Sequence, residues 1–175
     1  MSASEAYFLR AEGALKNWKM NGNAKEFYEK GVTVSMEERG VSVGNYLSDS
    51  YSTPADYVDP TDSGKNRAAV SKITPAYDES AGDAANLERI LVQKWIANFP
   101  NGWETWADIR RTGYPKHFPI VNNLNTDGVT IERGMRRLPY PQSEYNTNRA
   151  NVEAAVSMLG GADNSATDLW WAKKN

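Results

Sequence analysis

The residues with the greatest chemical potential are concentrated in one segment, FPNGWETWADIRRTGYPKHFP (residues 99–119). It holds the single histidine of the chain, His117, together with two tryptophans and two adjacent arginines. Because the chain has no second histidine and no cysteine, His117 cannot join a histidine or cysteine metal cluster. We interpret it as a surface or hydrogen-bonded structural residue, and we expect neither a metal site nor a cofactor.

Three carboxyl groups could supply acid–base chemistry of the kind that glycoside hydrolysis needs, namely Glu88, Glu104 and Asp108. Each also has a structural interpretation. Glu104 can reciprocate a helix cap, Asp108 can pair with Arg111, and Glu88 lies near a helix start, where the dipole favours an anion. The sequence has no nucleophile-elbow, P-loop or dinucleotide motif. We therefore expect no catalytic residues.

Two arginine pairs, at 110–111 and 136–137, could clamp an anionic ligand. Salt bridges to the protein's own acids are the favoured alternative. The whole chain has 20 basic and 22 acidic residues among 175, and this near balance gives no case for nucleic acid as a partner. Six tryptophans and nine tyrosines are typical either of recognition surfaces or of core residues whose polar tips are hydrogen-bonded.

Helical patterns predict a hairpin over residues 1–47. The first helix begins near Ser4, and NAKE (23–26) predicts an Asn23 cap and capping box for a second helix that ends at Gly40. A brief third helix is predicted over 40–47, capped by Ser42. Tetratricopeptide-like repeats bury their faces against neighbours, so a lone pair predicts further helices before this chain. The apolar stripe of the first helix comprises Tyr7, Ala11, Ala14, Leu15 and Trp18.

Residues 48–82 lack periodicity and predict a long loop, which is either functional or packed as a lid over the helices. Residues 83–175 predict further helices and proline-rich segments within a single domain, 1–175. The fold class is mainly α, with at most a short β hairpin or arm. The predicted elements are a helix over 83–99 with the stripe Leu87, Leu91, Trp95 and Phe99, a helix capped by Asn101 and ended by Gly113, a strand or arm over 129–141, and a helix capped by Asn148 and ended by Gly160.

Two long strings carry a family resemblance: ERILVQKWIANFPNGWETWADIRRTGYPKHFP (88–119) and RRLPYPQSEYN (136–146). They resemble the C-terminal part of the SusD/RagB-like outer-membrane nutrient-binding lipoproteins. The segments EAYFLRAEGALKNW (5–18) and AKEFYEKGVTVSMEERGVS (24–42) resemble the last tetratricopeptide-like helix pair of the same family. The resemblance covers nearly the whole chain.

The resemblance implies a surface-exposed binding protein rather than an enzyme. It implies capture of an oligosaccharide or other nutrient, together with a SusC-like TonB-dependent transporter as the partner. Family members are held to the outer membrane by a lipid on an N-terminal cysteine. Because they are about three times as long as a single domain of this size, we expect a soluble C-terminal fragment, with signal peptide, lipidated cysteine and earlier helices outside it.

No ligand residue of the family matches a position here, so the resemblance assigns only a structural motif that locks the C-terminal segments onto the helices. Its members are Trp103, Trp106, Tyr114, Pro139, Tyr140 and Pro141. From the residues alone, we predict ligand contacts in the long loop. There Tyr51 and Tyr57 could stack on sugar faces, and Asp56 or Asp59 could accept hydroxyl hydrogen bonds. Alternatively, these tyrosines pin the loop to the helices.

Two other functions remain open from the sequence. A helical protein–protein adaptor would fit the first hairpin but would need further repeats. A non-catalytic remnant of a carbohydrate-active enzyme would fit the many aromatic residues. An active member of that second class would need two carboxyl groups about 5–10 Å apart in a cleft.

Overall fold

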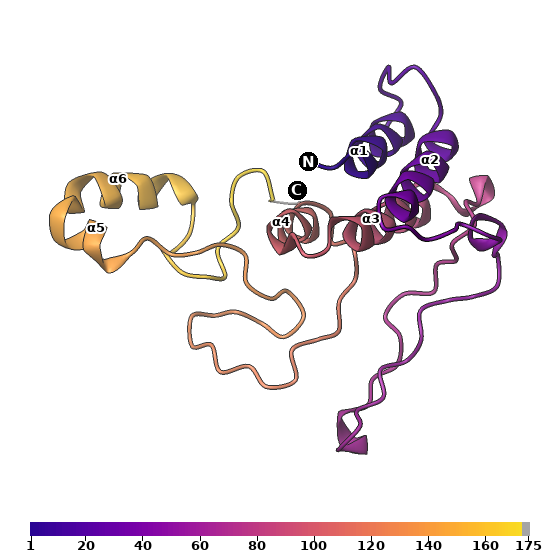
Figure 1. Ribbon diagram of the computed structural model, residues 1–175. Helices are drawn as coiled ribbons and strands as arrows, with labels where there is room; N and C mark the ends of the chain where they lie inside the picture. The colour runs from indigo at the N-terminus through magenta and orange to yellow at the C-terminus, as the bar shows by residue number, and fades with distance from the viewer. Residues whose placement is uncertain (173–175) are drawn as a thin grey trace. The chain divides into compact units, whose positions relative to one another are not determined.

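The computed structural model describes residues 1–172, and over this range the chain forms six α-helices and no named strand (Figure 1). The mainly α fold class predicted from the sequence is confirmed. The chain divides into two compact units. The first comprises residues 1–109 and 113–117 and contains the N-terminal helices; the second comprises residues 110–112 and residue 118 onward.

The first two helices each begin after a residue whose side chain accepts a hydrogen bond from a backbone amide of the first turn. In α1 (Ala3–Leu15) the side chain of Ser2 accepts a hydrogen bond from the Glu5 amide. In α2 (Ala24–Glu37) the Asn23 side chain accepts from the Glu26 amide at 2.8 Å, and the Glu26 side chain reaches back to the Asn23 amide. The predicted capping box is therefore confirmed.

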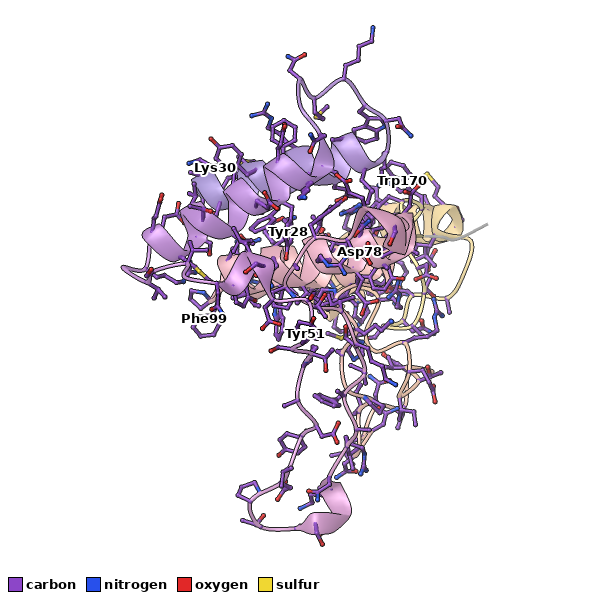
Figure 2. The ribbon with its side chains drawn as sticks, turned by 90° about the vertical axis from the view of Figure 1, so that its right-hand side faces the viewer. Tyr28, Lys30, Tyr51, Asp78, Phe99 and Trp170 are labelled. Atoms are coloured by element: carbon purple, nitrogen blue, oxygen red, sulfur yellow. The ribbon has the colours of Figure 1, made fainter. Side chains whose placement is uncertain are left out.

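The core of the first unit lies between α1, α2 and α3 (Asp83–Asn98). Phe8, Tyr28, Val32 and Ile90 are fully buried there, and Tyr28 points in among the helices (Figure 2). The predicted stripe of α1 is partly wrong. Phe8 takes the central position, and Trp18 is exposed because α1 ends three residues before it.

The segment 40–47 is not the predicted helix. Gly40 and Gly44 have φ values of +67° and +50°, which break right-handed helical geometry, and only one 3₁₀ turn forms, η1 (Tyr46–Ser48). The 3₁₀ turn follows Asn45, so Ser42 is not a cap. Two further single turns, η2 (Ser63–Lys65) and η3 (Glu79–Ala81), lie in the long loop.

The remaining helices are α4 (Gly102–Thr112), α5 (Gln142–Thr147), which the sequence analysis missed, and α6 (Arg149–Leu159). Gly113 and Gly160 end α4 and α6 in the left-handed conformation, as predicted. Asn101 and Asn148 precede these helices, but neither side chain makes a capping hydrogen bond. The side-chain oxygen of Asn148 accepts instead from the Asn151 side chain. Within the described residues, 129–141 is not a strand: residues 131–133 form a turn, and the Gly134 amide donates to the Thr130 carbonyl at 3.0 Å.

Candidate functional site

Residues 49–76 form an arm that projects from the helices of the first unit (Figure 1). Hydrogen bonds join its two sides at successive levels. At the base, the Ala76 amide donates to the Asp49 carbonyl at 2.9 Å. Further out, the Ala69 amide donates to the Asp56 side chain at 2.8 Å, and the backbones of Tyr57 and Arg67 exchange two hydrogen bonds. The long loop is therefore an ordered hairpin-like arm.

Asp59 organises the tip of this arm. One carboxylate oxygen accepts from the amides of Thr61 and Asp62 and from the Thr61 hydroxyl, each at 2.9 Å. The other accepts from the Tyr57 hydroxyl at 3.0 Å. The hydrogen bonds from Thr61, and then from Asp62, lower the pKa of the Asp59 carboxyl to about 2. Most of the acceptor capacity of Asp59 is therefore used by the loop itself.

The two tyrosines predicted to stack on sugars differ in their surroundings. Tyr51 is 91% exposed and lies where the arm leaves the helices (Figure 2). Tyr57 is 44% exposed, and its hydrogen bond to Asp59 raises the pKa of its hydroxyl. The structure thus brings Tyr57 and Asp59 together, whereas Tyr51 lies apart from them along the same side of the arm. Asp56 is engaged in holding the two sides of the arm together.

A hollow of about 360 Å³ separates the base of the arm from α3. Pro54 and Ile73 line one side, and Trp95 and Ile96 line the other. Beside them, the Gln93 side chain donates to the Tyr46 hydroxyl at 2.7 Å. Sequence reasoning missed this hollow because its lining extends from Tyr46 to Ile96 along the chain, and only the folded arm brings these residues together.

The residues of the predicted structural motif differ in how far they are buried. Trp103 is 69% exposed, and its ring lies 5.7 Å from the ring of Trp106, which is half-buried. In the first unit, Tyr114 is half-buried beneath the Lys116 ammonium, at 5.7 Å. In the second unit, the Tyr140 amide donates to the Asp163 carboxylate at 3.1 Å, whereas Pro139 and Pro141 are exposed.

The candidate catalytic carboxyl groups lie in structural surroundings. Asp108 is buried and accepts a hydrogen bond from Lys94 at 2.8 Å, and Glu88 pairs with Lys116 at 2.8 Å. Glu104 is exposed. Lys94 also lies 3.7 Å from Glu5, whose carboxylate accepts from the Asn98 side chain at 3.1 Å. Glu5, Lys94, Asn98 and Asp108 form a buried polar network that joins α1, α3 and α4.

In the second unit, the arginine pair at 136–137 is neutralised by the protein's own acids. Arg136 donates to Asp168 at 2.6 Å, and Arg137 pairs with Asp163. The Arg136 guanidinium also donates to the Arg110 carbonyl at 2.7 Å. His117 is exposed. Among the residues that the structure describes, no group of three or more His, Cys, Asp or Glu side chains is placed to hold a metal ion.

No helix in residues 1–172 is both long enough and apolar enough to cross a membrane. A family described as the Susd and RagB outer membrane lipoproteins matches residues 1–172. None of the curated proteins compared matches this chain.

Solved structures give the same family. A chitin-binding SusD homologue from Flavobacterium johnsoniae is 47% identical and superposes with a TM-score of 0.97 over 100% of this chain. A SusD-like protein from Bacteroides thetaiotaomicron is 54% identical, with a TM-score of 0.95 over 100% of this chain. A homologue from Bacteroides uniformis is 49% identical, with a TM-score of 0.94 over 99% of this chain and 37% of its own. The chain spans 36% and 37% of the first two relatives. Its helical fold and its sequence together show that this chain belongs to the SusD-like family of outer-membrane lipoproteins.

Proposed function

We propose that this chain is the C-terminal part of a surface-exposed, glycan- or nutrient-binding lipoprotein of the outer membrane. Family membership over residues 1–172 is the observation that carries this proposal. The parent protein would capture an oligosaccharide and deliver it to a SusC-like TonB-dependent transporter. The chain would act by binding rather than by catalysis, in keeping with the ion pairs that Asp108 and Glu88 make with lysines.

Chitin is the ligand class to test first. The Flavobacterium johnsoniae relative, 47% identical to this chain, is a chitin-binding protein. The sugar units of chitin offer apolar ring faces to aromatic side chains. They also offer hydroxyl and amide groups to polar side chains, and a tyrosine, with its ring and polar tip, can recognise both. We therefore propose a chito-oligosaccharide as the ligand.

The arm is where we propose that this chain contributes to binding. Tyr51 and Tyr57 are exposed on an ordered scaffold, which lowers the conformational entropy lost when a ligand binds. Asp59 then acts mainly through Tyr57, because it fixes the tyrosine hydroxyl and has little acceptor capacity left for a sugar hydroxyl. Trp103, Trp106, Tyr114, Pro139, Tyr140 and Pro141 retain the fold-holding role that the family resemblance gives them.

Calorimetric titration with chitohexaose tests this function. We expect binding without release of shorter sugars, and we expect Tyr51→Ala to weaken it about tenfold, a loss of about 1.4 kcal/mol. Val58→Ala, also on the exposed part of the arm, is the matched control and should leave the affinity unchanged. Equal affinities for the Tyr51 and Val58 variants would remove the arm from the ligand site. Hydrolysis of the sugar would contradict the non-catalytic function.

Affinity for the transporter is a separate measurement. We expect the parent lipoprotein to co-purify with a SusC-like transporter from solubilised outer membranes. Binding to unrelated apolar peptides in its place would favour a helical adaptor.

A further inference from the structure

Helix α3 has a second apolar face that its own unit leaves uncovered. Val92, Trp95, Ile96 and Phe99 follow one another at i, i+3, i+4 and i+7, and we call them the outer stripe. Trp95, Ile96 and Phe99 are 51%, 47% and 79% exposed, and Phe99 points away from the helices (Figure 2). The opposite face of α3 is buried against α1 and α2.

The outer stripe is the floor of a continuous groove. The hollow of about 360 Å³ at the base of the arm shares Trp95 and Ile96 with a second hollow of about 350 Å³, which Arg39 and Phe99 complete. A third hollow, of about 420 Å³, shares Arg39 and Phe99 with the second and continues to Ser2. The groove therefore runs along the C-terminal half of α3 and past its end.

The chemistry of this groove fits a helix better than it fits a charged or strongly polar ligand. Apolar residues at i, i+3, i+4 and i+7 form the stripe by which helices pack on one another. The nearest cation, Arg39, is already engaged. Its guanidinium donates to the carbonyls of Ala97 at 2.7 Å and Phe99 at 3.3 Å. In the first two hollows, the apolar side chains are therefore what remains for an occupant, whereas the third adds polar groups from Glu38, Asn98 and Asn101 at the end of the groove.

The solved relatives contain further residues, outside the region that this chain matches, that could form such a helix. The region matched by this chain is 36–37% of the length of the first two relatives. We propose that the outer stripe is the seat of an amphipathic helix that belongs to the part of a SusD-like protein outside this matched region. This interface serves assembly of the protein, so it does not depend on ligand capture.

A chimera tests the proposal. The matched region of the Bacteroides thetaiotaomicron relative is replaced by this chain, and thermal unfolding is measured for the chimera and for this chain alone. Ile96→Glu places a charge in the stripe, and Val58→Glu on the exposed arm is the matched control. We expect Ile96→Glu to lower the Tm of the chimera by several degrees and, at concentrations where the chain alone is monomeric, to leave that of the chain alone unchanged. Val58→Glu should change neither.

Two results would overturn the proposal. If the chimera tolerates Ile96→Glu as well as Val58→Glu, no helix of the relative covers the stripe. If Ile96→Glu lowers the Tm of the chain alone as much as that of the chimera, the stripe is covered within this chain.

A second measurement needs no chimera. Sedimentation of the chain alone should show association that rises with concentration and that Ile96→Glu abolishes, as expected of an uncovered stripe. A chain that stays monomeric and binds no dye specific for apolar surfaces has no free stripe, which would also overturn the proposal.

Discussion

The ring of Phe8 in α1 lies so close to Gly31 in α2 that a Cβ atom at position 31 would sit 2.8 Å from the ring. Glycine to alanine within a helix ordinarily stabilises it by about 1 kcal/mol. Phe8 is fully buried and cannot move aside, so we expect Gly31→Ala to destabilise the first unit by about 1–3 kcal/mol. Urea unfolding followed by far-ultraviolet circular dichroism measures this change.

Gly102 supplies the control for that substitution. It lies in the first turn of α4, and a Cβ atom there would meet nothing within 4 Å. We expect Gly102→Ala to leave stability unchanged or to raise it slightly. If both alanine variants are equally stable, the helix approach at Gly31 is looser than the structure shows.

Lys94 is buried between the carboxylates of Asp108 and Glu5. We expect Lys94→Met to destabilise the protein by about 3–5 kcal/mol, because it removes the buried cation that lies between these two carboxylates. Chemical unfolding measures the loss. Lys30→Met on the exposed side of α2 is the matched control and should cost less than about 0.5 kcal/mol (Figure 2). Equal effects would mean that the network contributes nothing to stability.

The tip of the arm should resist acid. The pKa of Asp59 is lowered from 3.8 to about 2, so its hydrogen bonds are fully present above pH 3.8 and are lost as the pH falls through about 2. In NMR spectra we expect the amide signals of Thr61 and Asp62 to stay constant from pH 7 to about pH 4 and to shift only near pH 2. A midpoint near 3.8 would show that these amides do not bind the carboxylate.

The second unit should depend strongly on Asp163. Its carboxylate accepts from Arg137, from the Tyr140 amide and from the Tyr145 hydroxyl at 2.7 Å. We expect Asp163→Asn to destabilise this unit by about 3 kcal/mol, because Arg137 is buried and loses its counter-charge. Hydrogen exchange with mass spectrometry should show faster exchange over 136–168 and unchanged exchange in α1 and α2.

Acid should affect the same region. Burial raises the pKa of the Asp163 and Asp168 carboxyl groups. Their hydrogen bonds and the neighbouring arginines lower each pKa by a larger amount, so the net shift is downward. The stability that these two carboxylates give the second unit is therefore complete above pH 3.8 and is lost as the pH falls through their lowered pKa values. If the protection of amides over 136–168 from exchange does not change on acidification to pH 2, this dependence is contradicted.

The local signals in the sequence predicted several helix ends correctly, although the side-chain caps predicted at Asn101 and Asn148 do not form. The capping box of Asn23 and Glu26 and the left-handed glycines Gly113 and Gly160 are short-range features, and all are present. The 40–47 helix was wrong because Gly44 has a positive φ that periodicity does not reveal. α5, with six residues, is too short to show a period.

The long-range features could not be predicted. The cross-links of the arm join residues 10 to 27 positions apart, and the Lys94–Asp108 pair joins two helices. The stripe of α3 was half right. Leu91 is buried, but Trp95 is exposed, because Lys94, Ala97 and Asn98 take the buried positions of this half of α3, and Phe99 is exposed beyond the end of the helix. The tyrosines and Asp59 predicted as ligand contacts lie on the arm, and their role in binding stays a prediction.

The placement of charge and apolar side chains on α3 also determines its mutational tolerance. In a scan of every substitution along this helix in the chain alone, the buried Glu88, Arg89 and Lys94 would be the intolerant positions. The large apolar side chains of Trp95 and Ile96 would accept polar replacements. Hydropathy alone would rank these positions in the reverse order, so a surface redesign guided by hydropathy would replace the charged residues that hold α3 in place.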